Sequence, residues 1–275
     1  SEWIGALRAK MVLSELGMRS MSGLTTKVQI PKIAAASAGF VAESGNVSEQ
    51  THTTTQLTLQ ARTLGAYTTC SRLLLLESDP SIEQIVRDDL VSAIASKIQN
   101  VAFNGGGTSE PDGVLQQTGI GIINVGDNGG PPTWALISNL LREVEIDNAI
   151  VNEATLGWAT NPKLKSKMSQ VAKVGSSDSV MLLNDPWNAL YGLPIRFSTD
   201  VPSNLTKGTS SGVCSALIVG DWSQLIHASW GNSPDVLVDP YGVTDGGVKI
   251  LVFSECDIGV RHAQSFAHTS DYTTT

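Results

Sequence analysis

A long amphipathic segment, residues 80–100, sets the scale of any fold that this chain can adopt. Asp79 stands where a helix N-cap is expected, and Pro80 takes the first helical position, where its missing N–H is not needed. At 1.5 Å per residue the helix would be roughly 30 Å long. Its apolar residues share one stripe: Ile82, Ile85, Val86, Leu90, Ala93, Ile94, Ile98 and Val101. Glu83 and Arg87 are spaced for an ion pair on the other side. We therefore predict a spine helix with the fold built along it.

The stretch 34–69 has a different character and indicates an extended hairpin. Seven of the fifteen residues from Ser44 to Thr58 are serine or threonine, and Glu49 is the only charged one. The flanks, 40–42 and 57–63, alternate with a period of two, as expected when one strand face packs and the other meets solvent. Because the hairpin is long for a compact domain, we expect it to pack on something else.

The remaining patterns mix helices and strands without regular βαβ repetition, which favours an α+β fold. Helices are predicted from Thr133 to about Ile146 and from Pro162 onward, the second with Asn161 as its cap. Strands are predicted near 154–159, 190–198, 216–220, 224–228, 236 and 248–253. Residues 1–30 are interpreted as an arm that lies outside the core, and the Thr-rich C-terminus as frayed.

Composition excludes several classes of protein. With 41% hydrophobic and 16% charged residues the chain can bury a core, and no apolar run approaches the roughly 20 residues that cross a bilayer. Eighteen basic against 26 acidic residues give a net charge of -8, which argues against DNA binding as the main task. The three cysteines are far apart and suggest reduced thiols. The start at Ser1 without a methionine is what removal of an upstream segment would leave.

One motif could carry chemistry. Residues 208–212 match G-x-S-x-G around Ser210, and Asp221 and His227 follow in the order found in serine hydrolases. A nucleophile elbow, however, needs a strand before the serine and a helix after it, whereas a polar stretch precedes Ser210 and a strand-like segment follows. A flexible loop accounts for the motif better.

No other set of residues predicts a site. The glycines 105–107 follow a helix and have no lysine after them, so they are interpreted as a helix stop and not as a phosphate-binding loop. The four histidines lack the spacing of a helical metal site. We therefore predict no enzyme activity, no catalytic residue, no cofactor and no metal, and the sequence favours a structural or binding role.

Six sequence landmarks, taken in order, resemble the major capsid protein family of tailed bacteriophages, which has the Hong Kong 97-like fold. They span nearly the whole chain: Ala38–Glu43 entering the Ser/Thr-rich loop, Leu73–Ser78, Ala102–Leu115, Trp158–Pro162, Tyr191–Ile195 and Val219–Trp222.

The resemblance implies a division of the chain into the parts of that fold. These are an N-terminal arm (1–33), an extended E-loop (34–73), a P-domain with the spine helix (74–129), an A-domain (130–235), the return strands of the P-domain (236–262) and a C-terminal segment (263–275).

The resemblance also implies a function and partners. Such a protein self-assembles as hexamers and pentamers into an icosahedral shell that encloses phage double-stranded DNA without sequence-specific binding. It is assembled in the bacterial cytoplasm and becomes part of the virion, with no membrane partner. A decoration protein, a portal and a scaffolding segment or protease are further partners that the family would imply.

Two alternatives stay open at this point. An encapsulin-type compartment shares the fold but encloses a protein cargo, and a serine hydrolase would use Ser210, Asp221 and His227. Some capsid proteins of this family crosslink an E-loop lysine to an asparagine of a neighbour. Residues 34–73 contain no lysine, the nearest being Lys32, and residues 240–247 contain no asparagine, so this crosslink is not expected.

Overall fold

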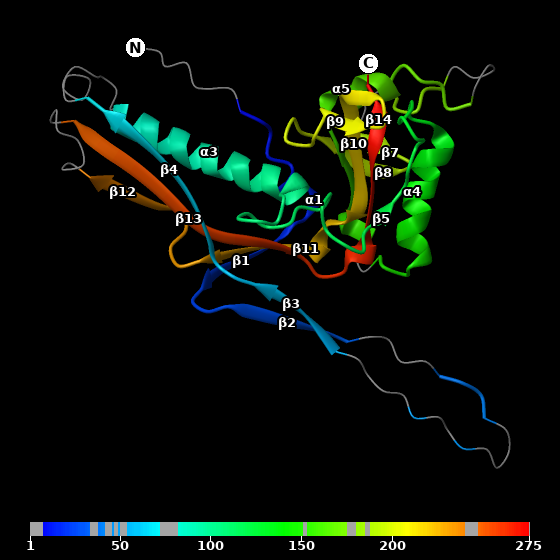
Figure 1. The fold of residues 1–275 in the computed structure, drawn as a ribbon, viewed down its shortest axis with the longest axis horizontal. Coiled ribbons are helices and arrows are strands. Elements are labelled where there is room, and N and C mark those ends of the chain that lie inside the picture. The colour runs from blue at the N-terminus through cyan, green and yellow to red at the C-terminus, as the bar shows by residue number, and fades with distance from the viewer. Residues whose placement is uncertain are drawn as a thin grey trace.

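The computed structural model describes residues 8–33, 38–41, 46, 49, 54–71, 82–150, 153–174, 180–184, 188–239 and 247–274. It contains two sheet units, a long helix beside one of them and a two-stranded hairpin that projects away from both (Figure 1). The predicted hairpin tip, the N-terminal seven residues and the cap at Asp79 and Pro80 lie outside the described residues.

The first unit is a five-stranded sheet built around one long strand, β13. Its order is β1-β11-β13-β12, and β4 pairs with β13 over nine residue pairs. The strands are β1 (Arg19–Leu24), β4 (Arg62–Cys70), β11 (Leu225–Trp230), β12 (Asp235–Asp239) and β13 (Val248–Val260). The Ile250 and Val252 side chains are fully buried on one face of β13. The sheet thus joins strands from the first 70 residues of the chain to strands that begin after residue 224.

The spine helix is α3 (Ile82–Asn104), which lies along β4 and β13 (Figure 1). The predicted stripe is confirmed in its second half, where Ile94 and Val101 are buried. In its first half Ile85, Val86 and Leu90 are only half-buried. The i,i+4 ion pair between Glu83 and Arg87 is present. The helix stops before Gly105, as the glycine run predicts.

The second unit is a seven-stranded sheet of order β5-β14-β10-β6-β8-β7, with β9 paired to β10. Its strands are β5 (Gly121–Ile122), β6 (Leu156–Thr160), β7 (Ala189–Leu190), β8 (Leu193–Phe197), β9 (Leu205–Lys207), β10 (Ser210–Asp221) and β14 (Phe266–Thr273). Helices α4 (Trp134–Ile146) and α5 (Pro162–Met168) share one buried cluster with it. The predicted cap of α5 is confirmed, because Asn161 accepts a hydrogen bond from Leu164 N–H. Thr133 caps α4 in the same way by accepting from Leu136 N–H.

The two units meet in one core. The described residues also form the short helices η1 (Glu153–Thr155), η2 (Trp222–Gln224) and η3 (Ala263–Ser265). Trp222 is fully buried and meets the rings of Phe103 and Phe266 edge-on, with centroids 6.0 and 5.4 Å away. These residues come from the end of α3 and the start of β14, so the same apolar cluster fixes the spine helix to the second sheet.

Two sequence expectations are wrong. The C-terminal β14 is not frayed: it lies between β5 and β10, and Tyr272 is fully buried. The N-terminal residues are not all outside the core, because α1 (Leu13–Leu16) buries Leu13 and Leu16 in the central cluster. Both errors have one cause. The partners that bury these segments lie far away in the sequence, where local patterning gives no signal.

The strand pairing also cuts across the predicted ranges. Strand β11 falls within residues 130–235 but pairs with β13, and β14 falls within 263–275 but pairs with β10. A crossover between the sheets therefore occurs at 222–224, and the eleven residues 225–235 of the predicted A-domain lie beyond it.

Candidate functional site

The hairpin of β2 (Val28–Ile33) and β3 (Thr54–Leu59) is held firmly at its base. Val28 pairs with Leu59 and Ile33 with Thr54 in antiparallel register. Leu59 is buried against Ile226, Ala228 and Trp230 of the five-stranded sheet. The Trp230 indole N–H donates to the Thr26 carbonyl at 2.8 Å. The hairpin therefore leaves the sheet in a fixed direction.

Beyond its base the hairpin exposes apolar side chains. Phe40 is fully exposed, Ile33 is 69% exposed, and Val41 is also exposed. Figure 1 shows the described residues 38–41 of this segment lying away from both sheet units. Exposed phenylalanine and isoleucine on a projecting element are typical of a segment that packs on another protein.

Polar contacts of Asp257 also fix the end of the hairpin nearest the sheet. Gln60 N–H donates to Asp257 Oδ2 at 2.9 Å, and Arg62 Nε lies 3.7 Å from Asp257 Oδ1. Burial raises the pKa of Asp257 despite these contacts, which favour its ionised form. The junction between β3 and β4 is thereby tied to β13 by side chains as well as by strand pairing.

A groove of about 1040 Å³ runs beside the spine helix. Its walls include Arg8 and Met11 from the N-terminal segment and Ile85, Val86 and Leu90 from α3. Arg8 closes one side by pairing with Asp89 at 2.5 Å. These helix residues are the half-buried part of the predicted apolar stripe, so the groove is the half of that stripe that no described segment of the chain fully covers.

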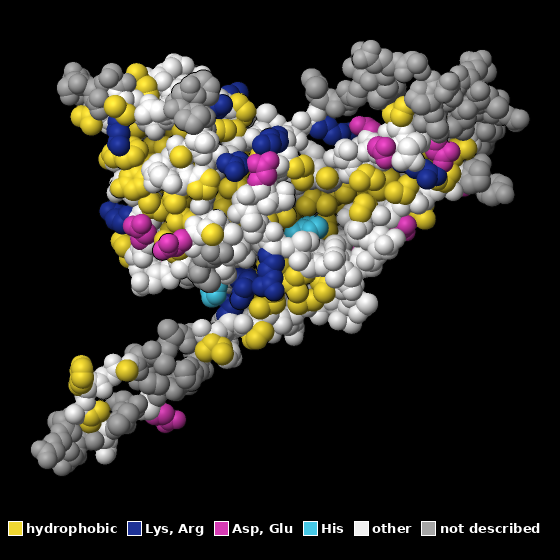
Figure 2. All heavy atoms as spheres, turned by 180° about the vertical axis from the view of Figure 1, so that it is seen from behind, with side chains coloured by type: hydrophobic (Ala, Val, Ile, Leu, Met, Phe, Trp, Pro, Cys, Tyr) yellow, Lys and Arg dark blue, Asp and Glu magenta, His cyan; other side chains and the backbone are white. Residues whose placement is uncertain are grey.

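The outer face of the five-stranded sheet is also apolar. Tyr67, Leu251 and Leu237 stand in one row across β4, β13 and β12, on the face opposite to buried Ile250 and Val252. Tyr67 and Leu237 are exposed, and Lys249 Nζ lies 4.3 Å from the Tyr67 ring centroid. Figure 2 shows hydrophobic side chains at the surface along the molecule and at the base of the hairpin.

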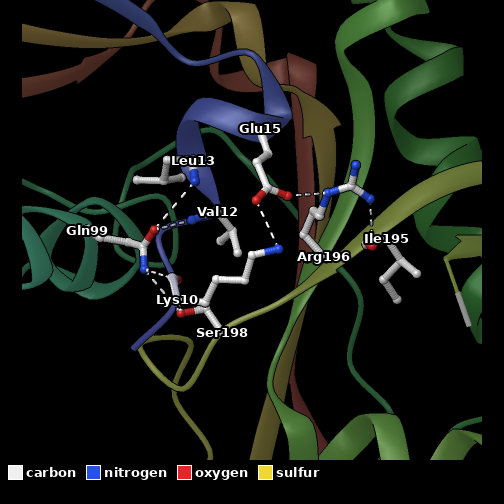
Figure 3. Close-up of polar contacts among 8 residues, drawn as sticks. All are labelled: Lys10, Val12, Leu13, Glu15, Gln99, Ile195, Arg196 and Ser198. Carbon is white, nitrogen blue, oxygen red and sulfur yellow. Dashed lines mark hydrogen bonds and ion pairs between the residues drawn. The ribbon is translucent and has the colours of Figure 1, made fainter. Parts of the chain in front are cut away.

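One buried amide joins three parts of the chain. Gln99, on α3, has no exposed surface. Its Oε1 accepts from Val12 N–H at 2.6 Å and from Leu13 N–H at 3.4 Å. Its Nε2 donates toward three acceptors, the Lys10 carbonyl (2.9 Å), Ser198 Oγ (3.1 Å) and Asp200 Oδ2 (2.6 Å). Figure 3 shows the contacts of Gln99 with the N-terminal segment at residues 10–13 and with Ser198, which follows β8.

An ion-pair network flanks this junction. Glu15 of α1 contacts Lys10 Nζ at 2.9 Å and Arg196 Nε at 2.8 Å, so α1 is linked to β8 (Figure 3). The Lys10 contact, more than any other, holds the pKa of the Glu15 carboxyl below its ordinary value. Because the Glu15 carboxyl is solvent-accessible, these ion pairs add little to the stability of the fold. Their main effect is to orient α1 relative to β8. Sequence patterning gave no signal for Gln99, whose partners lie about 90 and 100 residues away.

The serine-hydrolase alternative is wrong. Ser210 begins β10 and Asp221 ends it, so the twelve-residue strand separates them by roughly 35 Å. Asp221 instead caps η2, accepting from Ser223 N–H at 3.0 Å, and its carboxylate also accepts from Thr155 Oγ1 at 2.6 Å. His227 lies on β11 in the other sheet. The three residues cannot share one substrate.

Other reactive groups are buried singly. Burial raises the pKa of each of Cys70, Cys214 and Cys256, which keeps the thiols protonated. Burial also lowers the pKa of His227, and that of His268 to about 4. Among the described residues, no group of three or more His, Cys, Asp or Glu side chains is placed to hold a metal. In the same part of the chain no helix is long and apolar enough to span a bilayer.

Comparison with known proteins gives one family. The model of the phage capsid family matches residues 1–271. The major capsid protein of Halomonas phage phiHAP-1 is 23% identical over 264 residues, which cover 95% of this chain and 40% of that protein. The major capsid protein of Klebsiella oxytoca phage phiKO2 is 23% identical over 295 residues, covering 96% of this chain and 64% of that protein. The chain thus spans less than two thirds of the length of either relative.

Solved structures share the fold. The capsid of a native GTA particle, computed with C5 symmetry, superimposes with a TM-score of 0.76 at 17% identity, covering 99% of this chain and 94% of that one. The capsid of the Myoviridae phage XM1 gives a TM-score of 0.72 at 11% identity over 98% of this chain and 94% of the other. The predicted α+β, Hong Kong 97-like fold is confirmed.

Proposed function

Because the chain belongs to the phage capsid family, a family of structural proteins and not of enzymes, we propose that it is the major capsid protein of a tailed bacteriophage. It self-assembles as hexamers and pentamers into an icosahedral shell. The observation that carries the proposal is the hairpin β2–β3, which is anchored at its base by Leu59 and Trp230 but exposes Ile33 and Phe40 beyond it. A rigid base with an apolar, projecting end is suited to reaching a neighbouring copy.

The strand pairing supports a proposed division of the shell subunit into parts. We assign the N-terminal arm to residues 1–33 and the E-loop to 34–73. The P-domain comprises 74–129 and 236–262, and strand β11 joins it because it pairs with β13. The A-domain begins at residue 130, and the C-terminal segment 263–275 contributes β14 to its sheet. The groove beside α3 and the row of Tyr67, Leu251 and Leu237 are the apolar surfaces that neighbouring copies would cover.

The shell would be held by noncovalent contacts. Residues 34–73 contain no lysine, so the E-loop offers no amine for a crosslink. A subunit that touches several neighbours needs only modest affinity for each one, because a contact that opens is held in place by the others.

The contents and partners follow from charge and from the family. The net charge of -8 suits a wall that encloses double-stranded DNA without binding its sequence, because like charges repel. Assembly takes place in the cytoplasm of the host bacterium, and the finished protein is part of the virion. A portal, a decoration protein and a scaffolding segment or protease would act during or after assembly.

The test is the mass of the purified protein by light scattering, followed by electron microscopy of the same sample. Uniform icosahedral particles of megadalton mass are the expected result. A protein that stays a monomer or dimer under all assembly conditions contradicts the proposal. Nucleic acid inside particles isolated from infected cells separates the phage shell from an encapsulin-type compartment, whose particles would hold protein and no phage DNA.

A further inference from the structure

The two ends of α4 lie at opposite edges of the seven-stranded sheet. At its N-terminal end, Trp134 stacks on Tyr191, which follows β7, with ring centroids 4.9 Å apart. At its C-terminal end, Glu143 covers Gly121 of β5, since a Cβ at Gly121 would lie 3.3 Å from Glu143 Cβ. Strands β7 and β5 are the two edges of the sheet. The thirteen-residue helix separates these ends by roughly 20 Å.

The C-terminal end is acidic and apolar. Glu145 and Asp147 are exposed, and Glu143 is paired with Arg142 at 3.0 Å. Beside them Ile146 is 63% exposed and Ile122 of β5 is 58% exposed. We call these residues the acidic end: Ile122, Glu143, Glu145, Ile146 and Asp147. Negative charges at the C-terminus of a helix oppose its dipole, so Glu145 and Asp147 do not stabilise α4 through that dipole.

The N-terminal end is basic and apolar. Lys173 Nζ lies 3.8 Å from the Trp134 ring centroid, and Lys165 Nζ lies 4.8 Å from that of Phe197 on β8. Val180 and Tyr191 line one hollow with Trp134 and Lys173, and Lys163 and Val174 are also exposed. We call this set the basic end: Lys163, Lys165, Lys173, Val174, Val180 and Tyr191.

The charged side chains at the basic end all have the same sign among the described residues. Every charged side chain in the described residues 161–174, 180–184 and 188–197 is a lysine or an arginine. Asp178 and Asp185 belong to the same stretch but lie outside the described residues. Counting them, residues 161–197 still carry five basic against two acidic side chains.

We propose that the acidic end of one copy binds the basic end of the next copy around a capsomer. This inference rests on the proposed shell function and names the contact within it. A closed ring needs a heterologous interface, in which two different patches of each copy meet. Two ends of opposite charge, each with exposed apolar side chains, supply such a pair and give it a direction. Contact between two acidic ends or two basic ends is repelled, which disfavours two-fold dimers that would end the ring.

The test uses two charge-reversed proteins. The first carries Glu145→Lys and Asp147→Lys, so both of its ends are basic. The second carries Lys163→Glu and Lys173→Glu, so both of its ends are acidic. Each protein alone is expected to lose at least tenfold in yield of capsomers. The protein with all four changes keeps the native net charge and is expected to form closed shells again, because its two ends are complementary once more.

Mixing the two charge-reversed proteins gives a sharper outcome. Copies must then alternate around the ring, which is feasible for six subunits but not for five. The mixture is expected to give hexamers, seen by native mass spectrometry, but no pentamers and no closed shells. The proposal would be overturned if each charge-reversed protein assembled at the wild-type level. It would also be overturned if the capsomer yield stayed low both in the mixture and in the protein with all four substitutions.

Two controls separate other failures. If wild-type protein forms no particles, the proposed shell function is wrong, and the failure does not come from the contact between the acidic and basic ends. If a charge-reversed protein does not fold, as judged by its circular dichroism, the wild-type rate of capsomer formation is measured at salt concentrations from about 0.05 M to about 1 M. Screening is expected to slow it several-fold, and a rate independent of salt would overturn the proposal.

Discussion

Val12 donates its backbone N–H to the side-chain oxygen of Gln99 at 2.6 Å, across 87 residues of sequence. Leu13 N–H points to the same oxygen, and the amide nitrogen of Gln99 reaches back to the Lys10 carbonyl. The fully buried amide therefore satisfies backbone groups of the N-terminal segment that water cannot reach. It holds that segment, the spine helix and the loop after β8 in one arrangement.

Replacing Gln99 by leucine should destabilise the subunit by about 3 kcal/mol, because the change keeps the side-chain volume but leaves buried donors without an acceptor. Urea or thermal unfolding of wild type and variant in the same assembly state measures the difference. Asn100→Ala is the matched control. Asn100 is exposed on the same helix and donates only one long hydrogen bond, to the Asp200 carbonyl at 3.4 Å, so this change should cost less than about 0.5 kcal/mol. Equal losses in the two variants would contradict the role given to Gln99.

Local signals predicted the helices well. The cap at Asn161 and the glycine run after α3 act within four residues of the helix ends that they set, so one sequence is enough to find them. The fold class and the family followed from landmarks in their order. Gln99 could not be found in this way, because its burial depends on residues 10–13 and 198–200, which only the folded chain brings to it.

Long-range strand pairing explains the other errors. The Thr-rich end of the chain has the composition of a frayed tail, yet β14 is central because β10 pairs with it along its whole length. Ser210, Asp221 and His227 follow one another in the order of hydrolase catalytic residues. Their order in the sequence does not reveal that one strand, β10, holds Ser210 and Asp221 at its opposite ends. The assembly role could be inferred from sequence through the family resemblance. The two charged ends of α4 could be recognised only from the strand order of the seven-stranded sheet, which places them at opposite edges.

Gly105→Ala should destabilise the protein by more than about 4 kcal/mol. A Cβ at this position would overlap the Pro111 carbonyl oxygen and lie 2.8 Å from the Val101 carbonyl oxygen, and backbone atoms cannot move aside as side chains do. The adjacent Gly106→Ala is the control, because its Cβ would have nothing nearer than Glu110 Oε1 at 3.9 Å. Soluble yield and melting temperature of the two variants are compared. Similar stability in both would mean that the turn after α3 is looser than the structure shows.

Acid should weaken the fold through His268. The pKa of His268 is lowered by burial to about 4 in the folded chain, against 6.5 ordinarily, so the unfolded state binds the proton more tightly. Stability from this residue is complete above about pH 6.5, falls as the pH drops toward 4, and does not fall further below that. Between these two pH values the free energy of unfolding should fall by about 3 kcal/mol in total.

Replacing His268 by glutamine removes this titration. The melting temperatures of wild type and variant are measured at about pH 7 and about pH 4.5 in the same assembly state. The wild type should lose more stability than the variant between the two pH values. The comparison within each protein cancels any loss that the substitution itself causes. An equal fall in both proteins would show that other groups, such as buried carboxylates, carry the acid sensitivity.

The exposed hairpin should be required for assembly but not for folding. Phe40 is fully exposed and lies beyond the anchored base of the hairpin, so Phe40→Asp should leave the melting temperature of the unassembled subunit unchanged within about 2 °C. The same change should abolish closed shells, because a carboxylate would be buried without a partner where the phenylalanine packs on a neighbouring copy. Phe40→Leu keeps an apolar side chain and should still assemble, which separates loss of the apolar contact from damage to the hairpin. Electron microscopy and light scattering of the three proteins give the result, and normal shells from Phe40→Asp would show that the hairpin does not pack on a neighbour at this residue.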